Sequence, residues 1–122
     1  MSDDQLPVHL DQMFDLARAG EGLLLEFVDA GVPVEHADAQ GNTLLMLAAY
    51  HGHAELVQGL AERGADVNRL NARGQSPLAG AVFKNEPAVI GALLAAGADV
   101  DAGSPSARAT AQMFGRTLPG AF

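Results

Sequence analysis

The sequence of 122 residues contains no cysteine and no tryptophan, and aromatic residues make up only 5% of it. Without cysteine the chain can form no disulfide, no thiolate metal site and no cysteine nucleophile. Hydrophobic residues still amount to 48%, so the chain can bury a core, and we expect alanine and leucine to provide its packing. The length fits one small domain.

Long apolar runs and a basic leader are also missing. No apolar run approaches the roughly 20 residues that a membrane-spanning helix needs. The first residues, MSDDQLPVHLDQM, are acidic, whereas a targeting segment is basic and is followed by an apolar stretch. We therefore expect a cytoplasmic protein without membrane contact.

Positive charge is scarce in the first third of the chain. The formal net charge is −8. Residues 1–38 carry nine acidic residues and the single base Arg18, whereas residues 39–122 carry six residues of each sign. The acidic third would repel phosphates, which argues against nucleic acid as the partner. It is either a solvated end that keeps the chain soluble or a patch that steers a basic partner.

An internal repeat dominates the rest of the sequence. Residues 38–70, DAQGNTLLMLAAYHGHAELVQGLAERGADVNRL, align without a gap to residues 71–103, NARGQSPLAGAVFKNEPAVIGALLAAGADVDAG. The coinciding residues are Gly41 and Gly74, Thr43 and Ser76, Leu45 and Leu78, Ala48 and Ala81, and the Gly-Ala-Asp-Val runs at 64–67 and 97–100. A fixed period of this length is typical of stacked-repeat proteins.

These two copies resemble the ankyrin repeat. The resemblance implies an all-α solenoid of stacked helix-turn-helix units, joined by short β-hairpin fingers, with about four repeats including incomplete ones at the ends. The expected units of the single domain 1–122 are repeat 1 at about 8–37, repeat 2 at 38–70, repeat 3 at 71–103 and a C-terminal cap at 104–122.

Apolar spacing and glycines predict the helices of the first unit. The residues Leu10, Met13, Phe14 and Ala17 have the i, i+3, i+4, i+7 spacing of one helical face. Gly20 and Gly22 interrupt this helix, and the run LLLEFVDAG predicts a second helix that ends at Gly31.

In the later units, polar residues and proline indicate where helices begin. Thr43 resembles the residue that opens the family's inner helix, where its hydroxyl can accept a hydrogen bond from a first-turn amide. In the third unit Asn85-Glu86-Pro87 replaces the Gly-His of the second. Asn85 tolerates the left-handed conformation of a tight turn, and Pro87 fits the first turn of a helix.

The cap contains one expected inner helix, between Ser106 and Gly115, and no outer helix after it. A terminal repeat needs a polar outer face or a cover. Leu118, Pro119 and Phe122 either fold back as that cover or leave an exposed edge that serves as an interface.

We predict no catalytic residue, no metal site and no cofactor. His51 and His53 are close in sequence, but their i, i+2 spacing keeps them off a common helical face. The resemblance makes His53 a structural part of the turn between two helices. Asp66 and Asp99 occupy the same position in successive repeats, and we interpret them as residues that orient the outgoing loops. No phosphate-binding loop or nucleophile motif is found.

The resemblance places partner binding at the finger tips and at the last exposed residues of the inner helices. The candidate partner-binding residues at matching positions are Gln40, Asn42, Tyr50, His51, Leu70, Arg73, Gln75, Phe83 and Lys84. Tyr50 and Phe83 share one repeat position and are expected side by side. Aromatic residues and arginine dominate interface energies. Phe83 either stands in the groove or partly fills a gap between repeats.

The sequence thus predicts a non-catalytic module that holds a partner protein in its concave groove. One alternative is a homo-oligomer that assembles through the C-terminal end. A metal or small-molecule binder is disfavoured, because repeat grooves are open. The composition and the lack of a leader resemble small, free-standing bacterial ankyrin repeat proteins. The partner itself is not specified, since such grooves recognise unrelated proteins.

Overall fold

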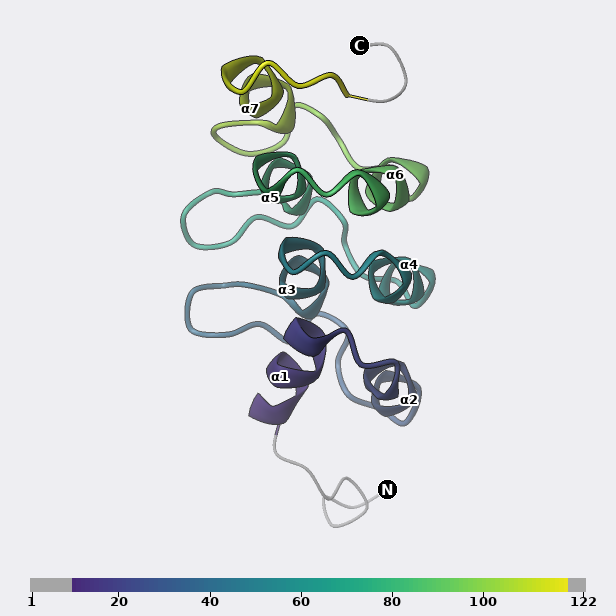
Figure 1. Cartoon of the computed structure of the whole chain (residues 1–122). Helices are drawn as coiled ribbons and strands as arrows, with labels where there is room; N and C mark the ends of the chain where they lie inside the picture. Colours follow the sequence, from purple (N-terminus) through teal and green to yellow (C-terminus); the bar gives the residue numbers. More distant parts are fainter. Residues whose placement is uncertain (1–9, 119–122) are drawn as a thin grey trace.

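The computed structural model describes residues 10–118, a range that contains seven α-helices and no β-strand. The helices are α1 (Asp11–Ala19), α2 (Leu23–Asp29), α3 (Leu44–Tyr50), α4 (Ala54–Glu62), α5 (Pro77–Lys84), α6 (Pro87–Ala95) and α7 (Ala107–Met113). Figure 1 shows them stacked in two columns, with α1, α3, α5 and α7 in the inner column and α2, α4 and α6 in the outer one. None of these helices has the length and apolar character that crossing a bilayer requires.

Each of the last three inner helices begins at a Ser or Thr whose side chain caps it. In all three the hydroxyl oxygen accepts a hydrogen bond from a backbone amide of the first turn, which satisfies one of the free amides there. The capping bonds are Thr43 to Met46 at 3.1 Å, Ser76 to Ala79 at 3.0 Å and Ser106 to Ala109 at 3.1 Å. The capping role predicted for Thr43 is confirmed.

The first helix pair follows its apolar spacing. Met13, Phe14 and Ala17 are buried, but Leu10 is exposed at the start of α1, where no side chain caps the helix. Gly20 ends α1 in the left-handed conformation, with φ of 73°. The sequence therefore predicted this helix correctly except for Leu10, which lies before the first full turn.

The turn from α5 to α6 is built differently from the turn from α3 to α4. Asn85 ends α5 with φ of 56°, a left-handed conformation that Asn adopts more easily than most residues. Pro87 is the first residue of α6, where its missing N–H loses no helical hydrogen bond. Gly52 serves the α3–α4 turn with φ of 83°. The conformations predicted for Asn85 and Pro87 are confirmed.

Leucine and alanine fill the core between the two columns. Leu45 and Leu78 are each 1% exposed, and Ala48 and Ala81 are fully buried. Because alanine side chains are short, α3 can pack closely between α1 on one side and α5 on the other. The expected role of these two residue types is confirmed.

Side-chain carboxylates and one side-chain amide form hydrogen bonds that fix the loops following the outer helices. Asp66 and Asp99 each accept a hydrogen bond at 2.9 Å from a nearby backbone amide of the same loop, those of Asn68 and Asp101. Their own amides donate at 2.7 Å to the side chain of the preceding unit, Glu35 for Asp66 and Asn68 for Asp99. The interpretation that Asp66 and Asp99 orient the loops is confirmed.

The fingers between the units are hairpin-like loops, which in Figure 1 project beyond the inner column. Within residues 10–118 they contain one isolated antiparallel bridge, between Ala37 and Thr43, and no strand. Asp38 accepts hydrogen bonds at 2.9 Å from the amides of Gln40 and Asn42. These side-chain bonds add to the backbone hydrogen bond that the amide of Asp38 donates to the carbonyl oxygen of Asn42 at 3.0 Å.

The C-terminal cap consists of α7 and the segment after it. The helix lies inside the predicted span from Ser106 to Gly115. Leu118 is buried and belongs to the core, as the hypothesis of a covered end requires for this residue. Pro119 and Phe122, the other two residues of that hypothesis, lie outside the described residues. The division into units at 8–37, 38–70, 71–103 and 104–122 stays a prediction.

Candidate binding groove

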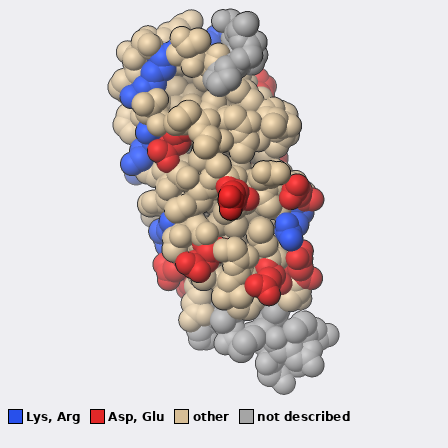
Figure 2. All heavy atoms as spheres, turned by 45° about the vertical axis from the view of Figure 1, so that its right-hand side comes forward, with Lys and Arg blue, Asp and Glu red and all other residues tan. Residues whose placement is uncertain are grey.

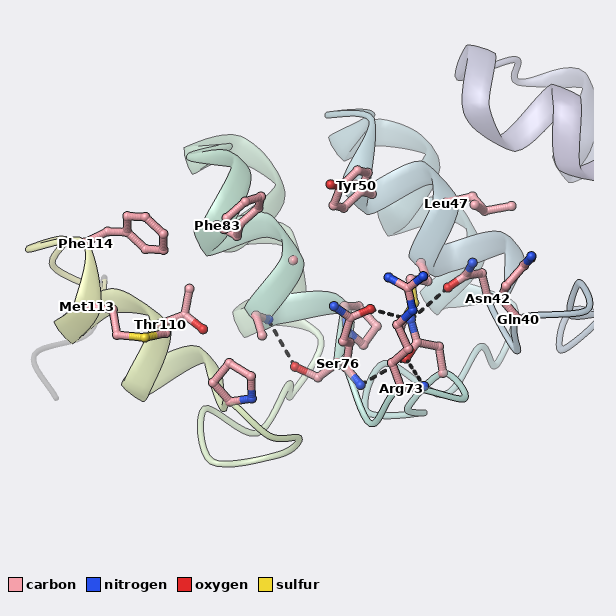
Figure 3. A pocket seen from close by; sticks show the side chains of 17 residues that line it. Gln40, Asn42, Leu47, Tyr50, Arg73, Ser76, Phe83, Thr110, Met113 and Phe114 are labelled. Carbon is pink, nitrogen blue, oxygen red and sulfur yellow. Dashed lines mark hydrogen bonds between the residues drawn. The ribbon is translucent and has the colours of Figure 1, made fainter.

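A groove of about 620 Å³ lies where α3, α5 and α7 face the projecting loops. Figure 3 shows the side chains that line it. The lining includes six of the nine predicted residues: Gln40, Asn42, Tyr50, Arg73, Gln75 and Phe83. The other three, His51, Leu70 and Lys84, are not part of the lining.

One wall of the groove is made by the two fingers, and Asn71 ties them together. Its side-chain oxygen accepts from the amides of Arg73 at 2.9 Å and Gln75 at 3.0 Å. Its side-chain nitrogen donates to Asn42 at 3.0 Å and to the Gln75 side chain at 2.8 Å. Side chains on this wall are therefore held in place before any partner arrives, which lowers the entropic cost of binding.

An aromatic rim runs along the ends of the inner helices, and we define it as Tyr50, Phe83 and Phe114. Figure 3 shows the three rings in a row, one from each of α3, α5 and the end of α7. The rings of Phe83 and Phe114 meet edge to face with their centroids 5.5 Å apart. Phe83 is 51% exposed, so it stands in the groove and also contacts the next unit. Both interpretations of this residue therefore hold in part.

The groove floor is uneven because one of its positions lacks a side chain. Leu47, Gly80 and Thr110 occupy the same place in α3, α5 and α7, one helical turn after the residue that caps each helix. A Cβ atom at Gly80 would meet, outside its own helix, only Cδ1 of Tyr50, at 3.4 Å. We call the resulting space above Gly80, between Leu47 and Thr110, the Gly80 notch.

Two cations lie over the aromatic rim. The ammonium of Lys84 is 4.9 Å from the centroid of the Tyr50 ring, and the guanidinium of Arg116 is 4.9 Å from that of Phe114. Arg116 also donates to two carbonyl oxygens at the end of α5, at 2.6 and 2.8 Å. Lys84 is therefore next to Tyr50, although it does not line the groove itself.

The remaining predicted residues lie at the margin of the groove. The ring of His51 meets that of Tyr50 edge to face, with centroids 5.9 Å apart. Burial lowers the pKa of His51, and the positive charges of His53, Arg18 and Lys84 lower it further. Leu70 is exposed just before the second finger. It is the one predicted residue with neither a place in the lining nor a ring contact to it.

His53 has a structural part, as the sequence predicted. Its Nε2 atom lies 2.7 Å from the carbonyl oxygen of Arg18, so a ring N–H donates across from α4 to the end of α1. His51 and His53 are thus committed to different neighbours. In residues 10–118 there is no cluster of three or more His, Asp or Glu residues suited to hold a metal ion.

Sequence reasoning missed the share of the groove that comes from α7. Met113 is 63% exposed and Phe114 48% exposed, and both line the groove. A usable signal was present: Ser106 repeats the cap Ser76, and the same step along the sequence leads from Phe83 to Met113. Gly80 was also missed, because its importance comes from the residues on the neighbouring helices.

The chain matches known proteins along most of its length. A family model described as ankyrin repeats, in three copies, matches residues 14–104. An ankyrin repeat protein of Pseudomonas aeruginosa is 48% identical over 48 residues, which is 38% of this chain and 28% of that protein. Ankyrin repeat domain-containing protein 29 of Homo sapiens is 44% identical over 57 residues, which is 45% of this chain and 19% of that protein. The chain thus spans less than a third of the length of these relatives.

A solved structure shares the fold. The crystal structure of the human ASB11 ankyrin repeat domain superposes with a TM-score of 0.68 at 29% sequence identity. The match covers 72% of this chain and 40% of that domain's chain. The stack of helix pairs in Figure 1 is therefore the architecture of an all-α repeat solenoid.

Proposed function

We propose, from the premise that the chain belongs to the ankyrin repeat family, that it binds a partner protein in the groove and performs no catalysis. The observation that carries this proposal is the aromatic rim. Tyr50, Phe83 and Phe114 expose a row of rings across three successive units. Exposed aromatic side chains in one concave surface are the residues that contribute most to protein interfaces.

The chemistry of the lining supports binding over catalysis. Its polar members are amides, hydroxyls and one guanidinium, and no histidine or carboxylate is among them. General acid–base catalysis commonly uses such a titratable group within hydrogen-bonding reach of the substrate. We accordingly propose that no cofactor, nucleic acid or membrane is involved. The cytoplasmic location stays a prediction.

His51, Leu70 and Lys84 complete the proposed contact surface at its margin. His51 and Lys84 border the rim at Tyr50, so a partner that covers the rim would touch both. Leu70 is exposed before the second finger, and we propose that a partner reaches it only if it extends past that loop.

The test is affinity capture from host lysate with matched variants. Tyr50→Ala with Phe83→Ala removes two rings of the rim, and Gln58→Ala with Glu62→Ala changes two exposed residues of α4 on the opposite column. We expect a protein that the wild type and the α4 variant retain and the rim variant loses, with affinity lower by at least about tenfold. Far-UV circular dichroism checks that both variants stay helical. Equal retention by all three proteins would place the site elsewhere.

A second candidate function is self-association through the C-terminal end. Met113 and Phe114 are exposed at the end of α7, and within residues 10–118 no outer helix follows α7. Light scattering behind a sizing column tests this directly. A mass that rises with concentration in the wild type but not in Met113→Ser with Phe114→Ser would support it. A constant monomer mass would reject it.

A further inference from the structure

The seven cationic side chains of the chain divide into two groups. Four of them form ion pairs with carboxylates: Arg18 with Asp15, Arg63 with Asp29, Arg69 with Glu35 and Arg108 with Asp101. For Arg73, Lys84 and Arg116, no carboxylate in residues 10–118 forms an ion pair. These three are the cations that line or border the groove.

The groove has no negative charge of its own to balance them. No Asp or Glu is among its lining residues. The finger carboxylate Asp38 is occupied by hydrogen bonds from Gln40 and Asn42. Figure 2 shows most of the visible acidic side chains over the lower half of the molecule, while blue side chains gather along the left-hand edge of its upper half. An acidic protein thus presents a locally positive concave surface.

The Gly80 notch restricts the shape of a ligand, in addition to the restriction that the positive charge imposes. It lies between Leu47 and Thr110, and its apolar surroundings include Met46, Ala79 and Phe83. Apolar surroundings of this kind favour a hydrophobic side chain over water. Gly80 itself supplies no side chain, and the ring of Tyr50, whose Cδ1 would lie 3.4 Å from a Cβ there, borders the space.

We propose, on the basis of the function proposed above, that the occupant of the groove is an acidic peptide segment of the partner. One large apolar side chain of this segment enters the Gly80 notch. Asp and Glu residues on either side of it face Arg73 on the finger and Lys84 beside the rim. The acidic surface of the rest of the chain attracts basic segments away from the groove, so electrostatic complementarity favours an acidic segment inside it. The notch sets the position of that segment along the groove.

Nucleic acid is the other polyanion that three cations could attract, and the distribution of charge disfavours it. A nucleic acid places phosphates along a line well beyond the groove. The groove is short and the chain carries a net charge of −8. A short peptide can place its carboxylates at the groove alone, without approaching the acidic first third.

The probe is a displayed library of short random peptides, selected on the immobilised full chain. The enriched peptides should contain more Asp and Glu than Lys and Arg, around one Leu, Ile, Phe or Trp. The best peptide is then synthesised with a fluorescent label, and its affinity is measured by anisotropy. A single-stranded oligonucleotide with the same label serves as the competing probe.

Three variants separate charge from shape. Arg73→Ser with Lys84→Ser removes two of the three cations without an ion pair and leaves Arg116, which is bonded to the end of α5. Arg18→Ser is the control for loss of a cation away from the groove. Gly80→Leu fills the notch with the residue that α3 has at the equivalent position, Leu47. Because the Cβ at Gly80 has ordinary contact distances and leucine favours helix, this variant should fold, and circular dichroism checks it. The charge variant alters only exposed side chains and remains informative if Gly80→Leu unfolds.

The proposal is supported if the charge variant and Gly80→Leu each weaken peptide binding by at least about tenfold, and Arg18→Ser changes it by less than about twofold. Raising salt from about 50 to about 300 mM should weaken wild-type binding further. If the enriched peptides are neutral or basic and bind the Gly80→Leu variant more weakly than the wild type, the groove remains the binding site but the proposal of an acidic occupant is overturned. Peptide binding that neither Gly80→Leu nor the rim variant affects would overturn the groove itself. No enriched peptide, or tighter binding of the oligonucleotide, would also reject the proposal.

Discussion

The helix pairs α3–α4 and α5–α6 come from adjacent copies of the sequence repeat, and they are alike where they meet the core and different where they meet the groove. Thr43 and Ser76 cap their helices in the same way, and Leu45 and Leu78 are equally buried. On the concave side Leu47 is replaced by Gly80, which opens the notch. Positions that fix the fold are therefore repeated, and the proposed binding surface differs between the units at positions such as this one.

The turns between the helices show that the two units also depend on one another. Gly52 takes a positive φ in the α3–α4 turn, and the carboxylate of Glu86 from the next turn occupies the space that a Cβ on Gly52 would need. His53 reaches back from the same turn to the carbonyl of Arg18. The choice of residue in this turn is therefore constrained both by the local backbone conformation and by contacts with the neighbouring unit.

The largest effect on stability is expected when the equivalent core side chain is removed from each of the two units. Leu45→Ala and Leu78→Ala each leave a cavity where the leucine was 1% exposed, and each should lower the free energy of unfolding by about 2–5 kcal/mol. Urea unfolding followed by circular dichroism measures both. A cost below about 1 kcal/mol at only one of the two positions would show that the two units are not equivalent in the core.

The helix caps should give the next largest effect. Thr43→Ala and Ser76→Ala each remove the acceptor of one first-turn amide, which costs about 1 kcal/mol. Thr43→Ser keeps the hydroxyl and is the control. The same unfolding experiment should find Thr43→Ser close to the wild type. A Thr43→Ala protein as stable as Thr43→Ser would mean that the hydroxyl does not stabilise α3.

Local chemistry explains which parts of this molecule the sequence predicted. The cap at Thr43, the turn at Asn85 and the start of α6 at Pro87 each depend on the properties of one residue type. Leu10 was placed wrongly because apolar spacing cannot tell where a helix begins. The loops have hairpin shape but no strand in residues 10–118, and the side chains of Asp38 and Asn71 accept hydrogen bonds from amides at their tips.

The groove was harder to predict, because its members meet only after the units stack. Met113 and Phe114 enter it because α7 packs on α5 and Met113 occupies the repeat position of Phe83. Arg116 bonds the carbonyl oxygens at the end of α5, which lie one unit earlier in the sequence. Leu70 was assigned to the same surface by its repeat position, but the finger carries it outside the lining.

A side chain added at Gly80 tests the difference between the two units on the concave side, with a smaller expected change in stability. Gly80→Ala should raise the free energy of unfolding by up to about 1 kcal/mol, since glycine is a poor helix former and the added Cβ makes only an ordinary contact. Gly91→Ala in α6 is the matched control, because its Cβ would meet nothing within 4 Å. Both should gain similar stability by urea unfolding. A loss at Gly80 alone would show that the ring of Tyr50 cannot move aside.

The smallest expected effect concerns an ion pair that joins the first two units but has no counterpart between the next two. Arg63 bonds Asp29 at 2.8 and 3.1 Å, whereas the equivalent positions of the next unit pair are Ala96 and Glu62. The hydrogen bond from Arg63 lowers the pKa of Asp29 below its ordinary value of 3.8. A lowered carboxylate pKa contributes stability above the unfolded value and loses it as the pH falls through the folded value.

Asp29→Asn should therefore lose less stability than the wild type as the pH falls below 3.8, and the difference should be small because water screens this exposed pair. Ala96→Arg supplies the missing partner of Glu62, which borders the same hollow between α4 and α6. It should raise the midpoint of thermal unfolding slightly at neutral pH and lose that gain when Glu62 is protonated. Thermal unfolding of the wild type and both variants across this pH range measures the two effects together. If Ala96→Arg stabilises equally at every pH, the gain comes from a cation placed at the C-terminal end of α6 and not from a restored ion pair.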